Sequence, residues 1–103
     1  MPELKTAFIS REQSKSNYDW ADLSIRGEII GKARCLINNH EFTIFSINIY
    51  PEYQGKGYGK KFIELIKPQF RKITADRVRY SAIGFWENIG FVRDGASGNW
   101  TYR

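Results

Sequence analysis

The chain has 103 residues, of which 42% are hydrophobic and 16% aromatic, and it carries a net charge of +5 with a pI near 9.5. This length and apolar content predict one folded domain spanning residues 1–103, because disordered chains are poor in aromatic and β-branched residues. No apolar run approaches the roughly 18 residues of a membrane span, and the N-terminus lacks the apolar stretch of a signal peptide. The charge favours anionic partners such as phosphates, nucleotides, nucleic acid or acidic protein surfaces.

Cysteine and histidine each occur once, as Cys35 and His40. An intrachain disulfide is therefore impossible, and we expect no metal site. Cys35 shares strand parity with Ala33 and Ile37, which predicts a buried structural thiol. His40 lies in an Asn-rich turn, which predicts a surface residue. Together these features predict a reduced, cytoplasmic protein.

Three segments in the first half show the alternation of apolar and polar residues that is typical of half-buried strands. They cover about residues 19–26, 29–37 and 41–50. Gly27-Glu28 predicts a tight turn that makes the first two segments a hairpin, and Asn38-Asn39-His40 supplies turn residues before the third.

The third strand changes phase. Phe42 and Ile44 share one parity, whereas Phe45, Ile47 and Ile49 share the other. Since neighbouring strand residues point to opposite faces, Ile44 and Phe45 cannot both face one core in a regular strand. Either both faces of this strand are covered, or a β-bulge inserts one residue here.

The second half begins with a helical pattern from residue 58 that Pro68 should kink or end near Lys67. Val78, Tyr80 and Ala82 alternate with polar residues, which predicts a fourth strand over 77–82. A short helix with Gly90 as its C-terminal stop and a closing hairpin then follow, over residues 85–90, 91–94 and 99–103, with the hairpin turn at 95–98.

The segment Gly55-Lys56-Gly57-Tyr58-Gly59 joins the third strand to the helix. A strand, a Gly-rich turn and a helix form a phosphate site, because the first helical N–H groups lack internal partners and the helix dipole is positive there. Glycines let the backbone approach a phosphate without Cβ clashes. Lys56, Lys60 and Lys61 add positive charge around the turn.

Three phosphate-binding motifs compete for this segment. A Walker-type loop fails, since Gln54 stands where its first glycine should be and Lys61 where Ser or Thr should be. A dinucleotide fingerprint fails, since Lys60 replaces its third glycine. The acetyl-coenzyme A loop Q/R-x-x-G-x-G/A matches Gln54, Gly57 and Gly59 at every defined position.

The segments Ile49–Gly59 and Ala82–Phe91 together resemble the GNAT family of N-acetyltransferases. The first is similar to the family's central motif and the second to its late A-x-x-F-Y-E-K-x-G-F pattern, so that the resemblance covers about residues 41–94. It implies an α+β (α/β) fold with a central mixed, mostly antiparallel sheet, a bulged strand and two flanking helices.

The resemblance also implies how acetyl-CoA would be held. The bulged strand separates from its parallel neighbour, and its free backbone groups, here those of Ile47 and Ile49, pair with the pantetheine arm. Phe85 and Asn88 would flank the thioester. The diphosphate would lie on the loop and the helix start, formed by Gln54, Gly55, Lys56, Gly57, Tyr58, Gly59 and Lys60.

The catalytic residues are less clear from the pattern. The tyrosine that often protonates the departing thiolate is replaced by Trp86, whose indole can only donate a hydrogen bond; Tyr80 and Tyr102 are alternatives. Thr43 stands where some members carry a catalytic glutamate. Glu41 and Glu52 are the candidate bases, acting through water, and each is otherwise a solvated surface carboxylate.

The leading interpretation is an acetyl-CoA-dependent N-acetyltransferase with an unidentified primary amine acceptor. Residues 10–18 are too short for the two helices that commonly shape the acceptor pocket. The acceptor site is therefore open, completed by a second subunit in a homodimer, or absent; an open site suits a protein or peptide amine. The alternative is a non-catalytic acetyl-CoA-binding or protein-interaction module. Nucleic-acid binding, suggested by Arg71, Lys72, Arg77 and Arg79, is the weakest interpretation, because no exposed aromatics interleave with them.

Overall fold

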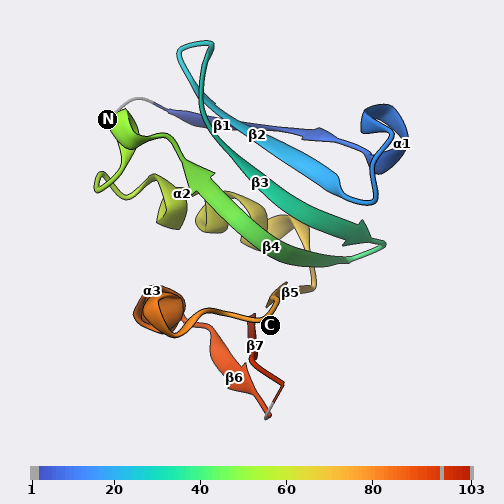
Figure 1. Cartoon of the computed structure of the whole chain (residues 1–103), viewed down its shortest axis with the longest axis vertical. Coiled ribbons are helices and arrows are strands. Elements are labelled where there is room, and N and C mark those ends of the chain that lie inside the picture. Colours follow the sequence, from blue (N-terminus) through green and yellow to red (C-terminus); the bar gives the residue numbers. More distant parts are fainter. Residues whose placement is uncertain (1–2, 96, 103) are drawn as a thin grey trace.

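The computed structural model describes residues 3–95 and 97–102. Its seven strands form one sheet in the order β1-β2-β3-β4-β5-β7-β6 (Figure 1). All neighbours are antiparallel except β4 and β5, so the expected mixed, mostly antiparallel sheet is confirmed. The strands are β1 (Leu4–Ile9), β2 (Asp19–Ile25), β3 (Glu28–Asn38), β4 (Glu41–Ile49), β5 (Lys72–Ala75), β6 (Val92–Asp94) and β7 (Asn99–Tyr102).

Within the described residues, three α-helices and three short 3-10 helices connect the strands. The α-helices are α1 (Arg11–Ser14), α2 (Tyr58–Ile66) and α3 (Ile83–Asn88), and the 3-10 helices are η1 (Pro51–Tyr53), η2 (Lys67–Gln69) and η3 (Tyr80–Ala82). The expected end of the long helix near Pro68 is confirmed, because α2 gives way to η2 there. Gly90 ends the segment after α3 with a φ of 95°, a left-handed conformation that favours glycine.

The core lies between α2 and one face of the sheet. Alternate residues of β2 and β3, such as Leu23 and Ala33, face α2 and are fully buried. From α2, Phe62, Ile63 and Ile66 pack onto them and are themselves fully buried. Burial of each of these side chains contributes about 1.5–3 kcal/mol. Residues of the opposite face are half-buried or exposed, among them Trp20, Asp22, Lys32, Arg34, Ser46 and Asn48.

The polar segment between β1 and β2 folds against the end of the sheet. Ser10 begins α1 with a capping box that pairs it with Gln13. The buried Asp19 carboxylate accepts hydrogen bonds from the backbone N–H of Arg11 at 2.7 Å and of Ile37 at 2.8 Å. These bonds hold the start of α1, and Lys15, with a left-handed φ of 54°, ends the helix after four residues. The face of the sheet opposite α2, the open face, has half-buried and exposed residues.

The predicted bulge in β4 is confirmed. Arg34 pairs with Ser46, but the next residue of β3, Cys35, pairs with Ile44, so that Phe45 is the inserted residue. Parallel pairing with β5 ends at the same place, at Ile44 and Ala75. Beyond this point β4 and the β5–β7–β6 part of the sheet turn away from each other (Figure 1). The inserted residue therefore marks where the sheet opens.

Several expected boundaries were wrong. Residues 77–82 do not form a strand. The parallel strand is β5, which starts five residues earlier, and η3 occupies Tyr80–Ala82. The cause is that Arg77 takes a left-handed φ of 46°, and its N–H donates to Asn99 Oδ1 at 2.8 Å, which turns the chain out of the sheet. β1 was not predicted. The first hairpin turns at Arg26-Gly27, both with positive φ, and not at Gly27-Glu28.

The closing hairpin is confirmed as β6 and β7, although Ala96 in its turn and Arg103 at its end lie outside the described residues. Among the residues that the structure describes, no helix has the length and apolar character needed to cross a membrane.

Candidate functional site

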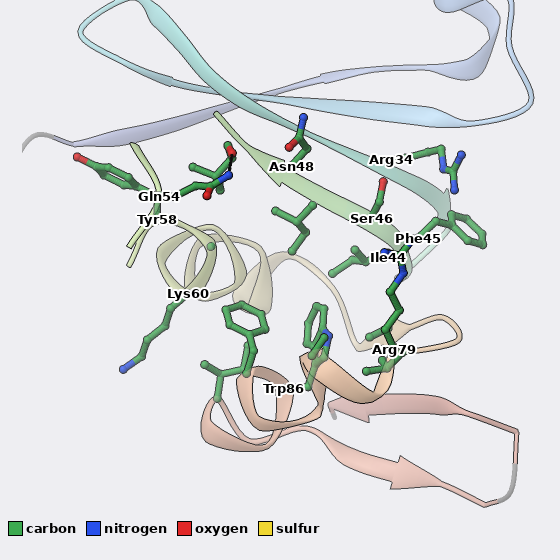
Figure 2. A pocket seen from close by; sticks show the side chains of 18 of the residues that line it. Arg34, Ile44, Phe45, Ser46, Asn48, Gln54, Tyr58, Lys60, Arg79 and Trp86 are labelled. Carbon is green, nitrogen blue, oxygen red and sulfur yellow. Dashed lines mark hydrogen bonds between the residues drawn. The ribbon is translucent and has the colours of Figure 1, made fainter. Parts of the chain in front are cut away.

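A groove of about 1180 Å³ lies where β4 and β5 separate (Figure 2). One wall is the bulged half of β4, the other is the chain after β5 together with α3, and one end is closed by the turn before α2. Its lining contains most of the predicted cofactor residues, namely Ile47, Ile49, Gln54, Gly55, Gly57, Tyr58, Gly59, Lys60, Phe85 and Asn88.

The backbone of β4 has a free edge along this groove. The N–H of Tyr50 donates to Ile30 O at 2.8 Å and so points toward β3. Because backbone groups alternate in direction along a strand, those of Ile47 and Ile49 point the other way, into the opening. The Ile49 carbonyl accepts a hydrogen bond from Gln54 Nε2 at 2.8 Å, which ties the start of the glycine turn to the end of β4.

The glycine turn presents backbone to open space. Gly55 and Gly57 have φ values of 77° and 83°, and a Cβ at either position would have nothing within 4 Å. Gly57 is the residue from which α2 begins. The first N–H groups of α2 therefore face the end of the groove without side chains in the way, as an anion site requires.

The third glycine of the motif has a packing role instead. A Cβ on Gly59 would lie 3.4 Å from the ring of Phe85, so glycine lets α3 approach α2 closely. Lys60 lines this end of the groove, whereas Lys56 does not; its Nζ lies 5.9 Å from the centre of the Tyr53 ring. Partial burial and then the Glu28 carboxylate raise the pKa of Tyr53, so its phenol stays protonated at neutral pH.

Of the three predicted catalytic residues, only Trp86 lies in the groove. It is 7% exposed, and its ring packs against Phe85 and Phe91 with centroids 5.0 Å and 4.8 Å away. Glu41 begins β4, four residues before the bulge, which corresponds to about 13 Å along the strand. Glu52 is exposed on η1.

The alternative tyrosines are also outside the groove. Tyr80 is 92% exposed, and the Tyr102 ring contacts Lys67 and Phe91 on the far side of α3. Cys35 lies next to the bulge but is fully buried, as predicted. Burial, and then the charge of Asp19, raise the pKa of Cys35 to about 12, so the thiol stays protonated and inert.

The charged residues at the bulge end of the groove were not predicted as residues of this site. They come from β3 and from the chain after β5, and they are Arg34, Asp76, Arg77 and Arg79. Asp76 accepts a hydrogen bond from Arg77 Nε at 2.9 Å, which raises the pKa of the Arg77 guanidinium. The alternation of Ile73 and Ala75 with polar neighbours was the signal that could have placed the strand, and hence these residues.

A mixed sheet that opens at a bulge beside a glycine turn and a helix N-terminus defines the class of protein. The sequence model of the acetyltransferase (GNAT) family matches residues 2–91, and the chain belongs to this family. It is 33% identical over 51 residues to an uncharacterized N-acetyltransferase of Oceanobacillus iheyensis, covering 50% of this chain and 31% of that protein. A second uncharacterized N-acetyltransferase, of Pyropia yezoensis, is 29% identical over 72 residues, covering 65% of this chain and 41% of that protein. The chain spans less than half the length of either relative.

Solved structures of similar fold include complexes with the cofactor. YhhK from E. coli, bound to coenzyme A, superimposes with a TM-score of 0.71 at 11% identity and covers 96% of this chain and 97% of its own. The PaiA N-acetyltransferase of Thermoplasma acidophilum, also with coenzyme A, has a TM-score of 0.63 at 19% identity. The match covers 90% of this chain and 65% of that one. A mutant of the AtaT toxin, with acetyl-CoA and the C-terminus of the antitoxin AtaR, has a TM-score of 0.69 at 11% identity. The match covers 97% of this chain and 92% of that one. At these identities the likeness shows the fold.

Proposed function

We propose that this chain binds acetyl-CoA in the groove and transfers its acetyl group to a primary amine. The observation that carries the proposal is the coincidence of three features: the bulge at Phe45, the end of β4–β5 pairing at Ile44, and the glycine turn at the other end of the same groove. Family membership and the presence of coenzyme A or acetyl-CoA in YhhK, PaiA and AtaT support it.

The proposed binding mode divides the cofactor between backbone and side chains. The pantetheine amides pair with the backbone groups of Ile47 and with the N–H of Ile49, as an added strand would, while the Ile49 carbonyl is held by Gln54. The diphosphate lies on the N–H groups of the turn and of the first residues of α2, from Gly55 to Lys60, and the Lys60 ammonium adds charge. Phe85 and Asn88 flank the arm near the thioester.

The proposed chemistry is direct transfer. The neutral amine attacks the thioester carbonyl carbon, a C–N bond forms as the C–S bond breaks, and the amine loses a proton while the coenzyme A thiolate gains one. None of the hydrogen bonds within the described residues uses the Trp86 indole N–H, so it is available to donate to the departing sulfur. Glu41 and Glu52 lie outside the groove lining, so we propose that either acts through water.

An observation also favours the second candidate, a non-catalytic acetyl-CoA-binding module. Asp76, the one carboxylate in the described groove lining, is engaged by Arg77, and Trp86 cannot give up a proton at neutral pH. The two candidates share the cofactor and differ in turnover.

The release of free coenzyme A thiol separates them. Purified protein is incubated with acetyl-CoA and a panel of amines: small amines, lysine-containing peptides and peptides with free N-termini. Amine-dependent thiol release and a mass gain of one acetyl group on the acceptor are expected. Acetyl-CoA binding with no amine-dependent release for any acceptor would exclude the enzyme and leave the module.

A further inference from the structure

The two ends of the groove have different charge arrangements. Lys60 lies at the glycine-turn end, and Arg34 and Arg79 lie at the opposite, bulge end (Figure 2). Arg77 is neutralised by Asp76 at 2.9 Å. In the described part of the chain, neither Arg34 nor Arg79 has a carboxylate within 4 Å. The bulge end therefore carries two guanidinium groups without counterions.

Arg34 is held in place while one of its donors is unused. Its guanidinium carbon lies 4.8 Å above the centre of the Tyr18 ring, and Tyr18 in turn packs against Phe45 at 5.2 Å. The Arg34 Nε is buried, and no hydrogen bond satisfies it within residues 3–95 and 97–102. None of the hydrogen bonds within the described residues uses the terminal nitrogens of Arg34 either, so this guanidinium is positioned by Tyr18 and its terminal N–H groups can bind an anionic partner.

Arg79 reaches the same end from the other wall. It precedes η3 and is itself exposed, and its side chain extends from there toward β4 (Figure 2). The two arginines thus come from opposite sides of the place where the thioester would lie. A carboxylate there could be bound by both, because a guanidinium donates through several N–H groups in a fixed plane.

We propose that the acceptor is a primary amine on a residue whose side chain carries a carboxylate, and that Arg34 and Arg79 bind this side-chain carboxylate as specificity-determining residues. This inference rests on the proposed acetyl transfer. The same positive charge disfavours an ammonium ion and so favours the neutral, reactive amine. The two arginines therefore help to keep the amine neutral, which is one of the tasks of a catalytic base.

The acceptor favoured by the open face of the sheet is a peptide with an acidic N-terminal residue. A free acidic amino acid offers the same chemistry. Nucleic acid fits less well, since it requires a longer track of basic and aromatic groups than two arginines at one end of a groove. Asp22, whose Oδ1 is also without a partner in the described residues, lies on the same face but outside the groove lining.

The test measures acceptor binding separately from turnover. Protein saturated with coenzyme A is titrated calorimetrically with matched peptides beginning with Asp or Asn, and with free aspartate α-amide or asparagine α-amide, which differ only in the side-chain carboxylate. We expect the acidic member of a pair to bind about tenfold more tightly, the scale of one charge-assisted hydrogen bond. Arg79→Gln and Arg34→Gln should each reduce this ratio toward one. Arg71→Gln, an exposed arginine outside the groove, should leave it unchanged.

Each outcome decides the inference. A preference among the peptides identifies a peptide acceptor, and one confined to the free α-amides identifies a small acceptor; both support the proposed chemistry. Equal affinities within every pair, or a preference that survives both groove substitutions, would overturn it. If coenzyme A itself does not bind, the proposed function fails, and the same titrations on the protein alone still decide whether the arginines select a carboxylate.

Discussion

The two ends of the groove are built in different ways. At the glycine-turn end the ligand would meet backbone N–H groups, which Gly55, Gly57 and the start of α2 expose within one continuous segment. At the bulge end it would meet side chains from β3, from the chain after β5 and from α3, which only the fold brings together. The first end suits a constant group such as a diphosphate. The second can change with the acceptor while the fold stays the same, which explains why family membership leaves the acceptor open.

The largest effect on stability and cofactor binding is expected for a substitution in β3 that displaces β4, the strand that runs along the groove. Gly31→Ala would place a Cβ 2.5 Å from the backbone oxygen of Asn48, on the half of β4 that lines the groove. We expect a loss of about 1–3 kcal/mol in the free energy of unfolding, measured in urea, together with weaker acetyl-CoA binding. Gly84→Ala is the control, since a Cβ there meets nothing within 4 Å and should leave stability unchanged or slightly raised. Equal stability of the two variants would show that β3 does not constrain the groove.

Trp86→Phe should separate chemistry from cofactor binding. It keeps an aromatic ring in the groove but removes the indole N–H, so kcat should fall about tenfold or more while the acetyl-CoA Kd is unchanged. Trp100→Phe is the matched control, because Trp100 is also buried, at 6% exposed, but lies outside the groove lining. If both variants lower kcat equally, the effect comes from packing and not from the N–H.

Lys60→Gln should weaken cofactor binding at the glycine-turn end alone. An exposed ammonium near a diphosphate contributes up to about 1 kcal/mol, so the acetyl-CoA Kd should rise about fivefold at low salt and less at high salt. Lys61→Gln removes the same charge from the next residue of α2, outside the groove lining, and should have little effect. A similar rise in both would point to the overall charge of the protein.

The smallest effect at neutral pH is expected for Cys35→Ala. Although Cys35 lies beside the bulge, its thiol is buried with a pKa of about 12. The variant should therefore keep its turnover, and mass spectrometry of the wild type after incubation with acetyl-CoA should find no acetyl group on Cys35. An acetylated Cys35 would contradict direct transfer.

The same thiol makes a pH prediction. Unfolding exposes Cys35 and returns its pKa to about 9, so above pH 9 the unfolded state holds fewer protons than the folded state. The free energy of unfolding should therefore fall as pH rises from 9 toward 12, by up to about 1.4 kcal/mol per pH unit. Denaturation of the wild type and of Cys35→Ala across this range should show a slope that the variant lacks.

The sequence predicted the features that depend on neighbouring residues. The change of phase at Ile44 and Phe45 indicated a bulge in this strand as one of two alternatives, and the spacing of Gln54, Gly57 and Gly59 located the turn before α2. Both depend on local rules, since side chains alternate along a strand and only glycine freely adopts a positive φ.

The features that were missed depend on contacts distant in sequence. β5 is only four residues long, and its pairing with β4 is what identifies it as a strand. The alternation at Val78, Tyr80 and Ala82 resembled a strand, but Arg77 had already turned the chain away. With β5 misplaced, Arg34 and Arg79 could not be assigned to one groove.

The glycine turn is proposed to hold the diphosphate of acetyl-CoA. The most direct test is calorimetric titration of acetyl-CoA into the wild type, Gly57→Glu and Gly27→Glu. The two glycines have φ values of 83° and 80° with open space around them, so the substitutions impose similar backbone strain, but Gly27 lies in a distant hairpin turn. We predict micromolar binding by the wild type and Gly27→Glu, and a loss of at least about a hundredfold in Gly57→Glu, where a carboxylate would occupy the anion site. Equal affinities in both variants, or no binding by the folded wild type, would contradict the account.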